Sequence, residues 1–214
     1  MVQRHRRAAF GSAYAFPGGV LEPADSRVSG CCAGLTDADA CRLLDLDAGG
    51  LAYYSAAIRE LFEEAGILLA TTSRPPAELE KARDALNAGH LAWDGFVVEA
   101  GLELRCDELH YFGFWITPEG APKRFSARFF LARLPQNQVA RHCGGELVDS
   151  CWLPARAVLE AREASEMKLI YPTRKTLESI ARFDAVEPLL EWARGCAQRG
   201  VVCDQPTLAP GMLG

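Results

Sequence analysis

Apolar residues recur at helical spacing over residues 51–65, and this segment is the clearest element in the pattern. The members of the apolar stripe stand three or four positions apart, as one face of a helix requires. They are Tyr54, Ile58, Leu61, Phe62 and Ala65. Gly66 follows directly, and glycine is a common helix stop because it adopts positive φ without strain. The pattern predicts a helix over residues 51–65 with one buried face.

Aromatic and β-branched residues crowd residues 108–117, and a second apolar run follows at about 124–134. The turn sequence TPEG stands between them at residues 117–120. The two runs therefore predict a β-hairpin with a longer loop. A further strand is predicted over residues 146–153.

Five more regions of the chain predict helices from apolar periodicity and boundary residues. They are residues 36–46, two segments within 75–104, and residues 154–164, 173–183 and 185–195. Thr36 or Asp37 is the N-cap candidate of the first. Pro75 and Pro76 open the first helix within 75–104, and an Ala-Gly pair at 88–89 separates it from the second.

The two ends of the chain show less periodicity. Residues 1–16 predict a basic strand that runs into a loop and ends at the turn FPGG, residues 16–19. Proline fixes this bend, and the two glycines let the backbone approach a ligand closely. Residues 22–50 are rich in Gly, Asp, Ala and Cys and predict an irregular excursion around one short helix. The tail from Cys203 onward is expected to be poorly ordered.

Composition narrows the class of protein. The 214 residues are 49% hydrophobic and 24% charged, close to the globular average, which rules out wholesale disorder. No apolar run approaches the ~20 residues that span a bilayer. The net charge of -5 argues against a nucleic-acid binder that works through bulk charge. Eight cysteines without a CxxC pair or zinc-finger spacing predict reduced structural thiols in a cytoplasmic protein.

Three carboxylates gather on one side of the helix predicted over residues 51–65. Glu60 stands three residues before Glu63 and four before Glu64, so all three project from the same side. Like charges at these spacings cost about 0.2–0.5 kcal/mol per pair, and the helix dipole disfavours anions in the last turns. One interpretation is a solvated acidic face. The other is a site for Mg²⁺ or Mn²⁺, which prefer clustered oxygen ligands.

The order of these residues resembles the Nudix hydrolases, whose box is G-x5-E-x7-R-E-U-x-E-E-x-G-U, with U a bulky aliphatic residue. Gly19 matches the opening glycine. Every fixed position of the second half is matched by Arg59, Glu60, Leu61, Glu63, Glu64, Gly66 and Ile67. Asp25 stands where the box has its first Glu, and residues 26–58 number 33 where the box has seven.

A box split by a long insertion resembles the coenzyme A diphosphatase branch of the family, typified by the mammalian peroxisomal enzyme and its bacterial relatives. Further segments resemble this branch. They are Arg4-His5 ahead of the FPGG turn, WITPEG at 115–120, RFSARFF at 124–130 and PTRKTLE at 172–178. The resemblance runs from the first residues to about residue 195.

The resemblance implies a Nudix-type α/β/α sandwich with a mixed sheet and helical insertions. We expect a single domain over residues 1–202, with one insertion at 26–50 inside the box and a second, helical insertion at 75–104. Residues 203–214 form the expected C-terminal tail. The branch has an extra strand ahead of the segment that matches Arg4, so the first strand of the sheet is expected to be missing from this sequence.

The resemblance also implies roles for residues of the box. The implied metal ligands are Glu60, Glu64 and, directly or through water, Glu63. The carbonyl oxygen of Gly19 is a further candidate ligand, because glycine lets the backbone come close. Arg59 is expected to pair with a carboxylate and hold it in place. Asp25 takes the role of the missing Glu only if the insertion returns it to the helix.

The general base varies within the family and usually lies outside the helix. Glu146 is the first candidate because it starts the strand predicted over residues 146–153, and Asp149 is the second. The two stand three residues apart, so only one of them can face the metals in a regular strand. A solvent-facing glutamate at the strand edge is the alternative for Glu146.

Basic residues are candidates for binding the phosphates of a substrate. Arg124 and Arg128 alternate with apolar residues, which places both on one face of the predicted strand. An exposed polar sheet face is the alternative. Arg4 and Arg6 precede the glycine turn and form the second pair of candidates, for which a plain basic N-terminal segment is the alternative.

The function that the resemblance implies is Mg²⁺- or Mn²⁺-dependent hydrolysis of coenzyme A or acyl-coenzyme A to 3′,5′-ADP and (acyl-)phosphopantetheine. Two alternatives stay open. One is a pyrophosphatase of the ADP-ribose or NADH type, and the other is a non-catalytic nucleotide-sensing module. The expected partner is a small nucleotide substrate rather than a nucleic acid or a membrane, and a homodimer is a possible assembly.

Overall fold

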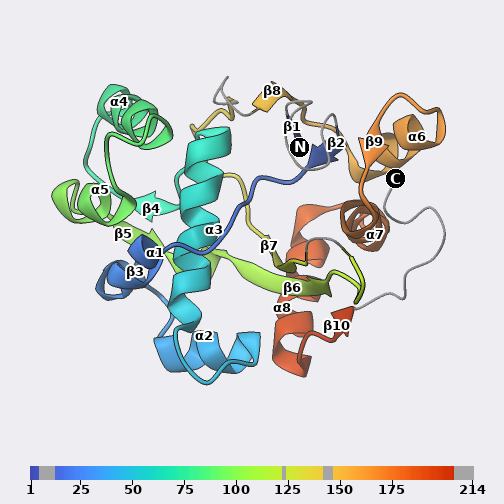
Figure 1. The fold of residues 1–214 in the computed structure, drawn as a ribbon, viewed down its shortest axis with the longest axis horizontal. Helices are drawn as coiled ribbons and strands as arrows, with labels where there is room; N and C mark the ends of the chain where they lie inside the picture. Colours follow the sequence, from blue (N-terminus) through green and yellow to red (C-terminus); the bar gives the residue numbers. More distant parts are fainter. Residues whose placement is uncertain (5–12, 122–123, 142–146, 205–214) are drawn as a thin grey trace.

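The computed structural model describes residues 1–4, 13–121, 124–141 and 147–204 of the chain. One long helix, α3 (Gly50–Ala65), runs through the middle of the molecule, and strands and shorter helices surround it (Figure 1). The three glutamates Glu60, Glu63 and Glu64 belong to this helix. Its surroundings therefore decide what those carboxylates can do.

Helix α3 confirms the helix predicted from the apolar stripe. It ends at Gly66, whose φ of 71° is the left-handed conformation that glycine adopts without strain. The N–H of Gly66 donates to the carbonyls of Leu61 and Phe62 and closes the helix. Tyr54, Ile58 and Phe62 are at most 3% exposed and lie in the main hydrophobic core. Their burial contributes roughly 5–9 kcal/mol, which holds α3 firmly in place.

The predicted β-hairpin is present as β6 (His110–Ile116) and β7 (Ser126–Leu131), which pair antiparallel. A third strand, β10 (Cys203–Asp204), pairs with β6 in parallel. The prediction of a poorly ordered tail from Cys203 onward is therefore wrong for its first two residues. They pair with an edge of β6, which a periodicity argument cannot detect in so short a segment. The rest of the tail, residues 205–214, lies outside the described residues.

Helices cover both faces of this sheet. On one face the ring of Tyr54 from α3 lies 5.0 Å from the ring of Phe130 in β7. On the other face Phe112 of β6 lies 5.5 Å from Trp192 of α8 (Val186–Arg199). This arrangement of helix, sheet and helix confirms the predicted α/β/α layers.

A second sheet has the strand order β8-β1-β2-β9. Its strands are β8 (Leu147–Ser150), β1 (Val2–Arg4), β2 (Ala13–Ala15) and β9 (Lys168–Leu169). Strand β8 confirms the strand predicted over residues 146–153. The single strand predicted within residues 1–16 is instead two antiparallel strands, β1 and β2. Residues 5–12 between them lie outside the described part of the chain.

Residues 22–50 hold more regular structure than their composition predicts. Helix α1 (Pro23–Arg27), the 3₁₀ turn η1 (Ser29–Cys31) and β3 (Cys32–Ala33) precede α2 (Asp37–Leu44). Helix α2 is the predicted short helix, and the Thr36 hydroxyl accepts from the N–H of Asp39, which confirms Thr36 as its N-cap. The elements that were not predicted span two to five residues, too few to show a period.

The second insertion contains the two predicted helices, α4 (Pro76–Asn87) and α5 (Trp93–Glu99). Around them lie β4 (Ala70–Thr71), β5 (Glu103–Arg105) and the 3₁₀ turn η2 (Cys106–Glu108). Strand β5 pairs with both β4 and β3. The small third sheet thereby joins the two insertions beside α3 (Figure 1).

The three predicted C-terminal helices are α6 (Ala155–Glu163), α7 (Tyr171–Ile180) and α8. Helices α6 and α7 enclose a small second core around Val158, Met167 and Leu177. Within the described residues, no helix is long and apolar enough to cross a membrane. The seven cysteines in the same part of the chain are free thiols.

Candidate active site

The glycine turn and the last turns of α3 meet in space, although some 40 residues separate them in the sequence. The N–H of Gly18 donates to Oε2 of Glu64 over 2.9 Å. Gly19 lies against Glu60: a Cβ added to Gly19 would stand 2.2 Å from Oε1 of Glu60. A side chain at position 19 would push the carboxylate of Glu60 out of its present place, which accounts for the second glycine of the turn.

Arg59 holds together the acidic residues around it. Its guanidinium is 3% exposed and donates to both carboxylate oxygens of Asp25, over 2.9 and 3.1 Å. Its Nη1 donates to Glu60 over 2.8 Å and to Glu63 over 3.2 Å, and its Nη2 donates to the carbonyl of Val20 over 2.9 Å. We call Arg59, Asp25, Glu60 and Glu63 the Arg59 cluster.

Arg59 stays positively charged despite its burial. Burial alone would lower the pKa of Arg59, but the hydrogen bond to Asp25 and the charges of Glu60 and Glu63 raise that pKa above its ordinary value. A bidentate guanidinium–carboxylate pair is also directional. Arg59 therefore fixes the positions of these carboxylates as well as balancing part of their charge.

Asp25 reaches the cluster from helix α1, directly before the first insertion. It is fully buried, and its Oδ2 also accepts from the N–H of Glu22 over 2.8 Å, which closes a capping box at the start of α1. The chain thus leaves the glycine turn, places Asp25 on Arg59 and then enters the first insertion, which leads to α2. The structure brings Asp25 to the box residue Arg59, and a role in catalysis stays a prediction.

Burial disfavours the negative charge of the remaining carboxylates of the cluster. It raises the pKa of Glu63 to about 7, because the stabilising charge of Arg59 does not offset burial and the neighbouring Glu60. Burial also raises the pKa of Glu60, which Arg59 partly opposes. Two desolvated carboxylates next to each other favour any cation that can approach them.

Within the described residues, no group of three or more His, Cys, Asp or Glu side chains is arranged to hold a metal ion. The carboxylates point to other partners: Arg59 donates to Glu60 and Glu63, and the N–H of Gly18 donates to Glu64. The residues nevertheless fit a hard divalent cation by their chemistry. All donors are oxygens, two carboxylates are desolvated, and the backbone of Gly19 lies beside Glu60.

Arg83 supports the last turn of α3, and the sequence interpretation did not include it. Its Nε donates to the carbonyl of Glu63 over 3.1 Å, and its Nη2 to the carbonyls of Glu64 over 3.2 Å and Arg141 over 2.7 Å. Asn87 also donates to the carbonyl of Glu63. Both side chains come from α4, so the second insertion caps the helix that carries the carboxylates. The sequence does not show this capping role, because an arginine on an amphipathic helix is most often exposed.

The predicted phosphate-binding arginines of β7 have different surroundings. Arg124 is exposed, precedes β7 and donates to the carbonyl of Thr117 over 3.2 Å. Arg128 lies between the rings of Tyr53 and Phe114, 4.5 and 4.4 Å from their centres. Tyr53 belongs to the first turn of α3, whereas the carboxylates belong to the last turns. The structure does not bring Arg128 to the Arg59 cluster, and substrate binding by either arginine stays a prediction.

The other predicted site residues fall at or beyond the limits of the described residues. Glu146 and Arg6 lie outside them. Arg4 and Asp149 belong to β1 and β8, which pair antiparallel, so their backbones lie in one sheet. The roles of these four residues stay predictions.

No protein-family model matches the chain. A solved structure does: a NUDIX hydrolase from Alicyclobacillus acidocaldarius is 26% identical, with a TM-score of 0.68 over 89% of this chain and 86% of that chain. The chain therefore has a Nudix-type fold. The likeness spans nearly all of both chains and supports a place among the Nudix hydrolases, which generally use divalent metals.

Proposed function

We propose that the chain hydrolyses nucleoside-diphosphate-linked substrates with Mg²⁺ or Mn²⁺, and that its substrate is coenzyme A or acyl-coenzyme A. The products are 3′,5′-ADP and (acyl-)phosphopantetheine. The observation that carries the proposal is the Arg59 cluster. It joins the two halves of a box that 33 residues separate in sequence, and it does so at a buried guanidinium.

The burial of the cluster argues against a solvated acidic face. The side chains of Glu60 and Glu63 are only 14% and 20% exposed. Asp25, Glu60 and Glu63 contact one guanidinium, a formal charge of -3 + 1 = -2. Glu64, bonded to the N–H of Gly18, adds a further carboxylate on the same side of α3. A protein tolerates such a charge at a half-buried site when a cation shares it. This supports a metal-dependent function.

Each residue of the site has a task in the proposed reaction. Glu60, Glu63 and Glu64 would hold the metal, with the carbonyl of Gly19 as a further ligand. When bound, the metal supplies a Lewis acid that screens the diphosphate and lowers the pKa of the attacking water. Arg59 keeps two of the carboxylates in place, and the N–H of Gly18 orients Glu64. Glu146 is the proposed base.

The coenzyme A assignment rests on the resemblance of the split box and of residues 115–120 and 172–178 to that branch of the family. ADP-ribose and NADH contain the same diphosphate bridge and would use the same carboxylates. The products distinguish these substrates, because among them only coenzyme A and its acyl esters carry the 3′-phosphate that yields 3′,5′-ADP. We propose the cytoplasm as the location of the reaction.

The experiment is a mass-spectrometric hydrolysis assay with coenzyme A, acetyl-coenzyme A, ADP-ribose and NADH in Mg²⁺ or Mn²⁺. We expect metal-dependent release of 3′,5′-ADP from wild type and a loss of at least 100-fold in Glu64→Gln. Glu99→Gln, an exposed glutamate at the end of α5, is the matched control and should keep full activity. Turnover of ADP-ribose alone would keep the chemistry and contradict the coenzyme A assignment. A folded protein without any turnover would contradict the proposed function.

A further inference from the structure

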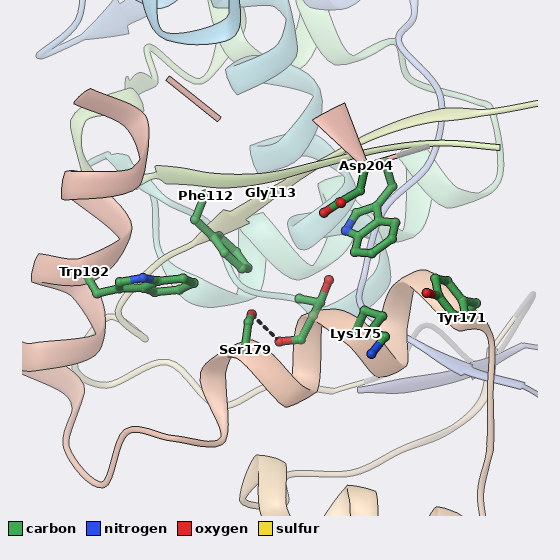
Figure 2. Close-up of a pocket in the computed structure, with 9 residues that line it drawn as sticks. Phe112, Gly113, Tyr171, Lys175, Ser179, Trp192 and Asp204 are labelled. Carbon is green, nitrogen blue, oxygen red and sulfur yellow. Dashed lines mark hydrogen bonds between the residues drawn. The ribbon is translucent and has the colours of Figure 1, made fainter. Parts of the chain in front are cut away.

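A cavity of about 530 Å³ lies between β6 and the helices α7 and α8, on the far side of the sheet from α3 (Figure 2). The two faces follow from the contacts of neighbouring residues in β6. Tyr111 packs on Phe130, which contacts Tyr54 of α3, whereas Phe112 contacts Trp192 of α8. The volume is in the range of small-molecule sites.

Aromatic side chains from three elements line this cavity. The rings of Phe112 and Trp192 are tilted by 59° at 5.5 Å, and the rings of Trp115 and Tyr171 are nearly perpendicular, 5.8 Å apart. Figure 2 shows Phe112 and Trp192 at one end of the cavity and Tyr171 at the other. Aromatic walls of this kind favour a flat, polarisable ring.

Polar groups at the cavity select among flat ligands. Asp204 of β10 points its carboxylate into the space between β6 and α7 (Figure 2), and among the described residues it has no ion-pair partner. An ionised carboxylate only accepts hydrogen bonds, so a matching ligand must present N–H or O–H donors. Lys175 also lines the cavity, with its amine paired to Glu178 at 2.8 Å. The flat aromatic walls and the acceptor carboxylate of Asp204 together favour a planar ring that carries N–H donors.

We propose that this cavity binds the base of a purine nucleoside or nucleotide. The ring lies between the aromatic pairs, and its amino or imino N–H groups donate to Asp204. Thr176 and Ser179 on α7 form the wall between the two pairs. The site uses none of the residues of the Arg59 cluster and needs neither a metal nor a diphosphate, so it goes beyond the proposed hydrolase function.

The test is isothermal titration calorimetry with adenosine, guanosine and purine riboside, whose base has no N–H donor. The buffer contains EDTA. We expect adenosine and guanosine to bind at least tenfold more tightly than purine riboside. Asp204→Ala should weaken adenosine about tenfold and leave purine riboside unchanged, because only the donors meet the carboxylate. Tyr171→Leu should weaken all three ligands, since it removes part of the aromatic wall.

Controls separate this site from the proposed hydrolase. Asp184→Ala, an exposed acid between α7 and α8 that does not line the cavity, should bind like wild type. Glu64→Gln should also bind like wild type, whether or not the chain proves to be a hydrolase. The proposal is overturned if folded wild type binds none of the nucleosides at millimolar concentration. Wild-type affinity for adenosine in both Asp204→Ala and Tyr171→Leu would overturn it as well, and so would loss of adenosine binding in Glu64→Gln. Binding of choline instead of the nucleosides would also overturn it.

Discussion

Replacing Arg83 with alanine tests how strongly the second insertion supports α3. Arg83 is 6% exposed, and its guanidinium donates to the carbonyls of Glu63, Glu64 and Arg141. The first two carbonyls belong to the last turn of α3, where the helix offers them no N–H partner. The substitution would leave these acceptors with water at best and would also remove a positive charge from the negative end of the helix dipole.

The magnitude follows from these contacts. A hydrogen bond to a charged donor contributes about 1.5–3 kcal/mol, and a cation at the end of a helix contributes about 0.3–1 kcal/mol. The loss in Arg83→Ala is smaller than the sum of these terms for two reasons. Water can reach the freed carbonyls, because the neighbouring Asn87 is exposed. Asn87 also still donates to the carbonyl of Glu63. We expect Arg83→Ala to lower the free energy of unfolding by about 3 kcal/mol. We also expect it to reduce hydrolysis at least tenfold below its unfolding temperature, because Glu63 and Glu64 lie in the turn that it loosens.

The assay is urea unfolding in EDTA, with Arg74→Ala as the matched control. Arg74 also donates to a main-chain carbonyl, that of Glu99 over 2.8 Å, and pairs with Glu78, but its side chain is 42% exposed. We expect the control to lose less than about 1 kcal/mol, since exposed pairs contribute little. Equal losses in the two variants would refute the reasoning that Arg83 acts by capping α3. Arg83→Lys keeps the positive charge but not the planar guanidinium, so its loss in the free energy of unfolding should lie between those of Arg83→Ala and Arg74→Ala.

Three further predictions concern the carboxylates. Gly19→Ala places a Cβ on the carboxylate of Glu60 and should lower the rate of hydrolysis at least tenfold with little change in melting temperature. Gly30→Ala, where an added Cβ meets nothing, is the control. Equal hydrolysis rates in the two variants would contradict the role of the close approach between Gly19 and Glu60. Asp25→Ala leaves the buried charge of Arg59 with weaker partners and should lower the free energy of unfolding by about 3 kcal/mol, measured in urea; a loss under about 1 kcal/mol would argue against the pair. Burial raises the pKa of Glu63 to about 7, so the metal-free folded state binds a proton that the unfolded state releases near pH 4.5. The stability in EDTA should therefore rise by about 1–2 kcal/mol as the pH falls from 8 towards 5, because solvent around this partly exposed carboxylate weakens the full linkage effect. Glu63→Gln should remove most of that rise.

The elements that the sequence predicted are those long enough to show a period. Helix α3 spans 16 residues and places one apolar face in the core, so its stripe repeats several times. The hairpin was visible because two aromatic runs flank the turn at residues 117–120. Strands β3, β4 and β9 have two residues each, and no pattern can repeat within two residues. Their positions depend on partners far away in the chain, which local patterns do not encode.

The candidate site divides in the same way. The spacing of Glu60, Glu63 and Glu64 follows from helix geometry and was predictable without a structure. The place of Asp25 was not, because the 33 residues after it can follow many paths. Arg83 carries no signal of its own, since a buried arginine on an amphipathic helix resembles an exposed one in sequence. Tertiary contacts decide both residues.

These two residues change how the insertions are understood. The first insertion continues directly from Asp25, which is bonded to Arg59, and the second insertion contributes Arg83, which donates to the last carbonyls of α3. Strands β3 and β5 then join the two insertions to each other. An insertion that only decorated the surface would make contacts of neither kind. We infer that both insertions hold α3 in place, so removing either one should loosen the carboxylates even though none of them belongs to an insertion.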